Sequence, residues 1–191
     1  MNLITIFIKA FLIDNIVLMG FLALCPLIGM STDEEKSLGM GLAVTFVTVL
    51  ATCVTWPIYK FILEPRGLVF LQILVFILVI ASLVQLVEFF LKKMVPSLYK
   101  SMGIYLALIT TNCAILAVTF NAISNGYNLL ESVVYAIGVA LGFLLAMLLL
   151  AGIRNRLRTC PVPAFLKGTP ILFAASALLS IAFMGFKGLV Q

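Results

Sequence analysis

The residues best suited to chemistry in this sequence are its four cysteines, Cys25, Cys53, Cys113 and Cys160. The chain of 191 residues contains no histidine. A Ser-His-Asp triad, a histidine-ligated haem, a Rieske centre and an HExxH zinc site are therefore excluded. Thiolates are soft ligands that bind zinc and iron–sulfur clusters, so the cysteines are the only soft ligands of consequence in this sequence.

These cysteines belong to an unusually apolar chain. Hydrophobic residues make up 64% and charged residues 10% of the sequence, against about 45–50% and about 25% in soluble globular proteins. This composition excludes a disordered chain, a disulfide-stapled secreted mini-protein and a nucleic-acid-binding arm. The net charge of +5 is too thinly spread for a nucleic-acid surface. In a membrane protein such an excess usually lies in cytoplasmic loops.

Six long stretches of the chain contain no Asp, Glu, Lys or Arg, and they are residues 15–32, 37–59, 67–87, 101–130, 132–153 and 168–186. Crossing the apolar core of a bilayer as a helix takes about 20 mainly apolar residues. We therefore predict an all-α membrane protein with six transmembrane helices in one integral membrane domain, residues 1–191. Asn128 and Glu131 form a capping-box pattern, which predicts the start of the fifth helix. The first residues lack the basic region of a cleavable signal peptide.

The distribution of basic residues predicts which side of the membrane each loop faces. The loops after the first, third and fifth helices contain eight Lys and Arg residues, and the opposite side contains three or four. Basic residues are enriched in cytoplasmic loops. We expect the odd-numbered loops to be cytoplasmic and both termini to lie on the outer side of the membrane.

A weak internal repeat relates the two halves of the chain, about residues 1–95 and 96–191. Residues Phe21–Gly29 align with Ile109–Ala117 at an offset of 88, and this alignment superposes the cysteines of the two segments. Because each half contains three predicted helices, the second half must enter the membrane from the opposite side. The expected architecture is an inverted repeat about a pseudo-two-fold axis in the membrane plane.

Both repeat-related cysteines, Cys25 and Cys113, lie beside residues that interrupt a helix. Pro26 lacks a backbone donor and disfavours helical geometry at Cys25. Before Cys113, the side chains of Thr-Thr-Asn at residues 110–112 can hydrogen-bond freed backbone groups. We therefore expect the first and fourth helices to be broken at the two cysteines. Cys25 follows Asp14 by 11 residues, roughly 16 Å along a helix, which places it near the middle of the bilayer.

Two cysteines near the middle of the membrane are too few for a complete metal site in this chain alone. A structural zinc site takes four ligands, and a [2Fe–2S] cluster takes four thiolates. We predict that Cys25 and Cys113 provide half of a [2Fe–2S] site and that a pseudo-symmetric partner protein provides the other half. The alternatives are a small inverted-repeat ion or solute transporter with incidental cysteines, and a structural membrane anchor. Cys53 is interpreted as apolar filler and Cys160 as a loop thiol in a reducing cytoplasm.

Several segments resemble one protein family. Two of them are Phe21–Gly29, with the sequence FLALCPLIG, and Ile109–Ile115, with the sequence ITTNCAI. The others are residues 11–15, 41–45, 81–88, 131–135, 150–154 and 183–186. Over nearly its whole length the chain resembles the A-type subunit of Rnf-type electron transport complexes, a family shared with the D-type and E-type subunits of the sodium-translocating NADH:quinone oxidoreductase. Ala117 departs from the family pattern, which usually has Gly at this position.

The resemblance implies a function and a location. Rnf-type complexes of bacteria and archaea pass electrons between reduced ferredoxin and NAD⁺ and couple this transfer to movement of Na⁺ or H⁺ across the cytoplasmic membrane. The A-type subunit pairs with an inverted, homologous E-type subunit, and each donates two cysteines to one intramembrane [2Fe–2S] cluster. On this chain those ligands are Cys25 and Cys113. The resemblance thus implies a translocase subunit without a catalytic site of its own, because the nucleotide and ferredoxin sites lie on other subunits.

Two acidic residues, Asp14 and Glu88, border the predicted helices, where such groups are costly and often mark ion paths. Asp14 is interpreted either as an interfacial cap or as part of such a path. Glu88 precedes Lys92 by four residues, a spacing that favours an interfacial ion pair. The pair Gly138 and Gly142 predicts a small-residue face on which another helix can pack closely.

Overall fold

The computed structural model describes residues 3–13, 15–31, 34–67, 69–94, 105–161, 163, 166 and 168–185, and every regular element in this part of the chain is helical. The α-helices are α1 (Leu3–Ile8), α2 (Ile16–Gly20), α3 (Leu24–Met30), α4 (Glu34–Ile58), α5 (Gln72–Met94), α7 (Tyr105–Thr110), α8 (Cys113–Ser124), α9 (Leu129–Thr159) and α10 (Thr169–Met184). Short π or 3₁₀ segments are η1 (Lys9–Ile13), η2 (Tyr59–Leu63), η3 (Glu64–Arg66) and η4 (Val69–Leu71). The prediction of an all-α protein is confirmed for the described residues.

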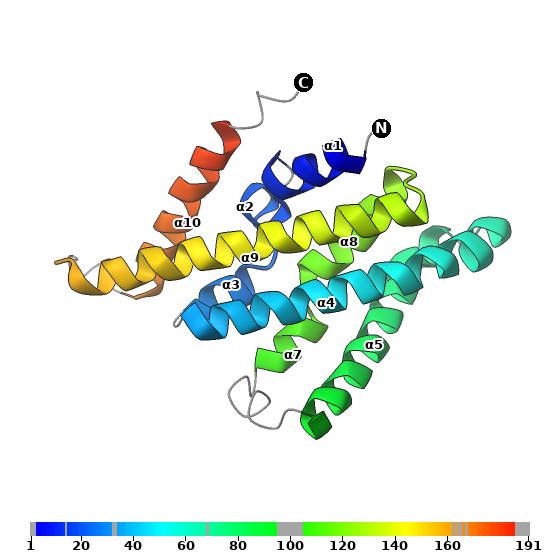
Figure 1. Cartoon of the computed structure of the whole chain (residues 1–191), viewed down its shortest axis with the longest axis horizontal. Coiled ribbons are helices and arrows are strands. Elements are labelled where there is room, and N and C mark those ends of the chain that lie inside the picture. The colour runs from blue at the N-terminus through cyan, green and yellow to red at the C-terminus, as the bar shows by residue number, and fades with distance from the viewer. Residues whose placement is uncertain are drawn as a thin grey trace.

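Among the residues that the structure describes, three helices are long and apolar enough to cross a membrane. They cover Ser37–Leu63, Gln72–Phe90 and Leu129–Thr159, which are the second, third and fifth predicted spans. Shorter apolar helices cover Leu108–Ser124 and Thr169–Met184. The first and fourth predicted spans are each divided in two, as α2 with α3 and as α7 with α8 (Figure 1). Six complete spans and the inverted repeat stay predictions.

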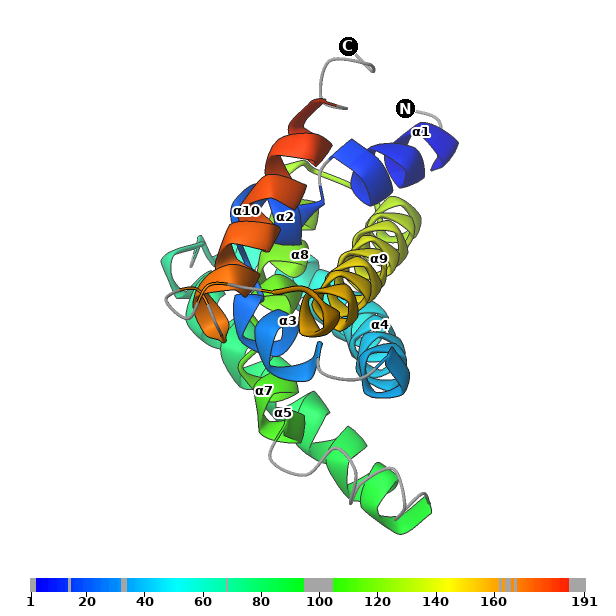
Figure 2. The same cartoon turned by 90° about the vertical axis from the view of Figure 1, so that its left-hand side faces the viewer.

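The core of the fold is the antiparallel pair α4 and α9, which lie side by side over much of their length (Figures 1 and 2). Buried side chains in the shared core include Met40 and Val44 of α4 and Met147 of α9. Gly41 permits this close approach, because a Cβ atom there would lie 2.6 Å from Cδ1 of Leu144. The interrupted helices pack against this helix pair.

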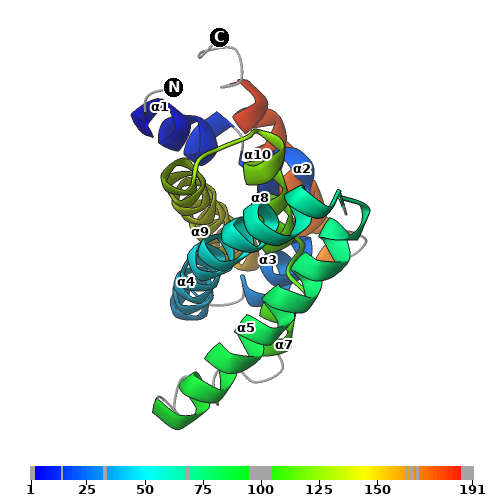
Figure 3. The ribbon, with the colours of Figure 1, turned by 90° about the vertical axis from the view of Figure 1, so that its right-hand side faces the viewer.

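The segment formed by α1 and η1, which the sequence analysis did not assign to a helix, packs on α9. A Cβ atom at Gly138 would lie 2.9 Å from Cβ of Ala10, and one at Gly142 would lie 3.0 Å from the carbonyl oxygen of Phe11. The predicted small-residue face of Gly138 and Gly142 is therefore confirmed, and the segment that packs on it is α1 with η1. The start of α1 and the end of α10 lie at the same end of the molecule (Figures 2 and 3).

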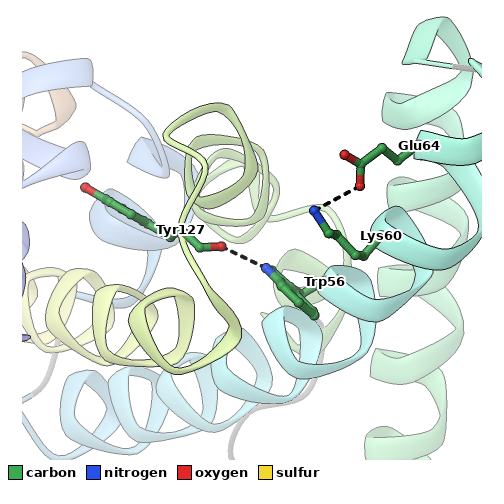
Figure 4. A network of polar contacts seen from close by, with 4 residues as sticks. All are labelled: Trp56, Lys60, Glu64 and Tyr127. Atoms are coloured by element: carbon green, nitrogen blue, oxygen red, sulfur yellow. Dashed lines mark hydrogen bonds and ion pairs between the residues drawn. The ribbon is translucent and has the colours of Figure 1, made fainter.

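Polar contacts hold the connection between α8 and α9 against α4. The indole Nε1 of Trp56 on α4 donates to the carbonyl oxygen of Tyr127 at 2.9 Å (Figure 4). The predicted capping box at the start of α9 is confirmed, with the backbone nitrogen of Asn128 donating to Oε2 of Glu131 at 3.0 Å. These contacts fix where α9 begins and so fix its register against α4.

Candidate functional site

The first predicted span is interrupted between α2 and α3, where the chain leaves helical geometry. Phe21 has φ 51° and ψ 29°, and Ala23 has φ 59° and ψ 33°, so both residues are in the left-handed region. This conformation costs a residue with a side chain about 1–2 kcal/mol. The surrounding structure must therefore hold the backbone of this break in place.

The break precedes Cys25 instead of falling on it. Cys25 is the second and Pro26 the third residue of α3. The first turn of a helix tolerates proline, because the N–H groups there have no acceptor inside the helix. The prediction that Pro26 disfavours helical geometry at Cys25 is therefore wrong, and the interruption lies at residues 21–23.

The second break separates α7 from α8. Asn112 adopts an extended conformation, and its Oδ1 accepts a hydrogen bond from the backbone N–H of Ala114 at 3.0 Å. The backbone N–H of Asn112 donates to the carbonyl oxygen of Ile109 at 3.3 Å. Cys113 is the first residue of α8. The expectation that a polar side chain takes up a freed backbone group at this break is confirmed for Asn112.

A hydrogen bond joins the two breaks across 90 positions of the chain. The backbone N–H of Ala23 donates to Sγ of Cys113, with a nitrogen–sulfur distance of 2.9 Å. Cys113 is half-buried, and Cys25, two residues after Ala23, is exposed. The two thiols therefore lie at the starts of two helices, α3 and α8, and a hydrogen bond joins the breaks that precede these helices.

Side chains from α9 and α10 satisfy carbonyl groups near the C-terminal ends of the two helices of the first span, α2 and α3. Oγ of Ser180 on α10 donates to the carbonyl oxygen of Leu18 at 2.5 Å. The guanidinium of Arg154 on α9 donates to the carbonyl oxygen of Ile28 at 3.0 Å and to Oγ of Ser31 at 3.2 Å. The sequence analysis missed both roles, although a serine in an apolar helix is a known signal of bonding between helices.

Two asparagines cap half-helices in the same way but differ in their amide nitrogens. Asn15 is fully buried, its Oδ1 accepts from the N–H of Val17 at 3.3 Å, and its Nδ2 donates to the carbonyl oxygen of Gly142 at 3.0 Å. Asn112 is 5% exposed, and its Nδ2 has no partner within the part of the chain that the structure describes. An unpartnered buried donor therefore lies directly beside Cys113.

The remaining candidate residues lie away from the two breaks or outside the described residues. Cys53 is exposed on α4, and Cys160 is exposed where α9 ends. Glu88 is half-buried on α5, and Asp14 lies outside the described residues. Across the described ranges, no three His, Cys, Asp or Glu side chains gather into one group.

Comparison with known proteins agrees with the resemblance noted in the sequence. A family model described as Rnf-Nqr subunit, membrane protein, matches residues 3–190. The A-type subunit of the ion-translocating oxidoreductase complex of Syntrophotalea carbinolica is 53% identical, over 99% of this chain and 98% of the relative. The A-type subunit of the Na⁺-translocating ferredoxin:NAD⁺ oxidoreductase complex of Acetobacterium woodii is 50% identical, over the same shares of the two chains. The chain therefore belongs to the Rnf-Nqr family of membrane protein subunits.

Proposed function

We propose that this chain is a membrane subunit of a complex that transfers electrons between ferredoxin and NAD⁺ and moves Na⁺ or H⁺. In this complex, Cys25 and Cys113 hold half of an intramembrane [2Fe–2S] cluster. The relatives support the assignment to a complex, because their names describe subunits of ion-translocating oxidoreductases. The chain then takes part in a translocase as an electron relay and has no catalytic site of its own.

The observation that carries the cluster proposal is the hydrogen bond from the N–H of Ala23 to Sγ of Cys113. It holds the backbone just before Cys25 against the other cysteine. Hydrogen bonds from N–H groups to a charged acceptor are stronger than neutral ones, and the N-terminus of α8 adds a partial positive charge. A ligand thiolate at Cys113 therefore receives stabilisation that an apolar membrane interior does not otherwise provide.

The two thiols fit half of a cluster site. A [2Fe–2S] cluster needs four thiolates, and the paired breaks offer two. Cys25 is exposed and Cys113 half-buried in the chain by itself, which suits completion of the site by an inverted, homologous E-type subunit. When bound near the midplane, the cluster supplies one-electron chemistry and divides a bilayer about 30 Å thick into two shorter electron transfers.

The proposal includes six transmembrane helices, arranged as two inverted three-helix repeats in a bacterial or archaeal cytoplasmic membrane. The antiparallel contact between α4 and α9 supports this arrangement, because these helices are the second and fifth predicted spans and correspond under the repeat. The breaks support it as well, because they interrupt the first and fourth spans. We expect both termini on the outer side of this membrane.

Metal analysis of the purified complex tests the proposal. The unmodified complex is expected to contain iron and acid-labile sulfide and to give the EPR signal of a reduced [2Fe–2S] cluster. Cys25→Ser and Cys113→Ser are each expected to abolish this signal, and the control Cys53→Ser is expected to retain it. An intact, active complex without the cluster would contradict the proposal. So would ion transport by this chain alone in liposomes that Cys25→Ser leaves unchanged.

A further inference from the structure

Two buried side-chain nitrogens have no hydrogen-bond partner in the described part of the chain, Nε2 of Gln72 and Nδ2 of Asn112. Of the two residues, only Asn112 is adjacent to a cysteine, Cys113, and it is 95% buried because its exposed fraction is 5%. Apolar side chains and lipid tails offer such a donor no acceptor. Leaving it unpaired is unfavourable, so the amide of Asn112 calls for an acceptor that the described part of the chain does not contain.

The capping role of Asn112 does not account for its amide nitrogen. Oδ1 accepts from the N–H of Ala114 at 3.0 Å, and this bond determines which end of the amide is oxygen and which is nitrogen. Serine and aspartate cap helices about as well as asparagine, and neither would bury an N–H₂ group. The amide nitrogen is thus a feature that the start of α8 does not need.

The capping asparagine of the other interrupted span provides the contrast. Asn15 uses its Oδ1 in the same way, toward Val17. Its Nδ2 is paired with the carbonyl oxygen of Gly142 at 3.0 Å. The fold therefore provides an acceptor for the amide nitrogen of Asn15. Of the two capping asparagines, it is Asn112, beside the candidate ligand, whose amide nitrogen has no partner among the described residues.

We propose that Nδ2 of Asn112 donates a hydrogen bond to a sulfur atom of the group bound at Cys113 and thereby raises the reduction potential of that group. The inference rests on the proposed function, because a cluster would bring thiolate and sulfide acceptors next to this residue. Reduction adds negative charge, and hydrogen bonds to the sulfurs are among the factors that set the potential of a cluster. The donated hydrogen bond stabilises the reduced form more than the oxidised form.

A redox titration of the purified complex, followed by EPR, tests this inference. Asn112→Ser keeps a capping oxygen and removes the N–H₂ group, and Asn112→Asp does the same with little change of shape. In both variants the midpoint potential is expected to fall. For Asn112→Ser, the expected size is on the order of a tenfold change in the ratio of reduced to oxidised cluster, about 59 mV for a one-electron couple.

Asn15→Ser is the matched control, because it removes the same group at the other interrupted span. It is expected to lower the unfolding temperature and to leave the midpoint potential unchanged. Loss of iron from assembled Asn112 variants but not from Asn15→Ser also supports the inference, because the donor then helps to hold the group.

Three results would overturn the inference. One is an unchanged potential in both Asn112 variants, and another is an equal shift in Asn15→Ser. The third is failure of both Asn112 variants to assemble with the other subunits, because the amide then serves the fold or a subunit contact. A lack of iron and sulfide in the unmodified complex is a separate result. It would overturn the proposed function, and this inference with it.

Discussion

The two helix breaks each place a cysteine in the first turn of the following helix, but they do so by different local chemistry. Before α3, Phe21 and Ala23 adopt left-handed backbone conformations, and Ala23 provides no side-chain cap. Before α8, the side chain of Asn112 caps the helix, and neither residue of the interruption, Thr111 or Asn112, has a positive φ. The start of α8 is therefore satisfied locally, whereas the first break depends on groups from other helices.

The dependence of the first break on distant groups gives one residue two roles. The N–H of Ala23 uses Sγ of Cys113 as its acceptor, and the carbonyl oxygen of Leu18 uses Ser180 as its donor. Cys113 is thus both a structural partner of the first break and a candidate ligand. The two halves are therefore unequal, and loss of long-range contacts is expected to weaken the first break more than the second.

Removing the capping asparagines should give the largest difference in stability between the two halves. Asn15→Ala loses a cap, worth about 0.5–2 kcal/mol, and the buried hydrogen bond from Nδ2 to the carbonyl oxygen of Gly142, worth about a further 0.5–1.5 kcal/mol. Asn112→Ala loses only a cap, so its expected cost is about 1 kcal/mol. Unfolding of the purified protein in detergent measures both values. Equal losses would contradict the claim that only the first amide is structurally paired.

The serines of α10 provide a test of intermediate size. Ser180→Ala removes the donor to Leu18 on another helix and is expected to cost about 1–3 kcal/mol. Ser176→Ala is the matched control, because Ser176 bonds the carbonyl oxygen of Phe173 within its own helix. Its expected effect is small, within about 0.5 kcal/mol, because the higher helix propensity of alanine offsets the lost bond within the helix. The same unfolding measurement separates the two, and a larger loss for Ser176→Ala would show that α10 does not support the first break through this bond.

Glycine substitutions should also distinguish the two breaks, because only the first contains an alanine in the left-handed region. Ala23→Gly relieves a left-handed alanine by about 1 kcal/mol but loses a buried methyl group worth about 0.8 kcal/mol, so the net change is expected to be near zero. Ala114→Gly loses a similar methyl group inside α8, and the lower helix propensity of glycine costs about a further 1 kcal/mol. Its expected cost is about 1.8 kcal/mol. Comparable losses at both positions, measured by unfolding, would mean that Ala23 is not strained.

Patterns within a few residues of one another predicted much of the fold. The apolar stretches over α4, α5 and α9 predicted long helices, because a helix in a bilayer must keep its polar and charged residues at its ends. The capping box of Asn128 with Glu131 and the small face of Gly138 with Gly142 were also predicted, since each is a feature of spacing along one helix. The family resemblance, carried by the segments around the cysteines, was confirmed by the comparisons.

The amino-acid sequence was enough to predict the long helices α4, α5 and α9, the positions of the cysteines relative to polar and proline residues, and the family. The position of the first break at residues 21–23, and the hydrogen bond from the N–H of Ala23 to Sγ of Cys113, became visible only in the folded chain. The same holds for the packing of α1 on α9 and for the different partners of Asn15 and Asn112. The physical reason is that a left-handed residue or a freed backbone group is stabilised by whatever the fold brings against it. Those partners come from positions about 90 to 160 residues away, beyond the reach of any local pattern.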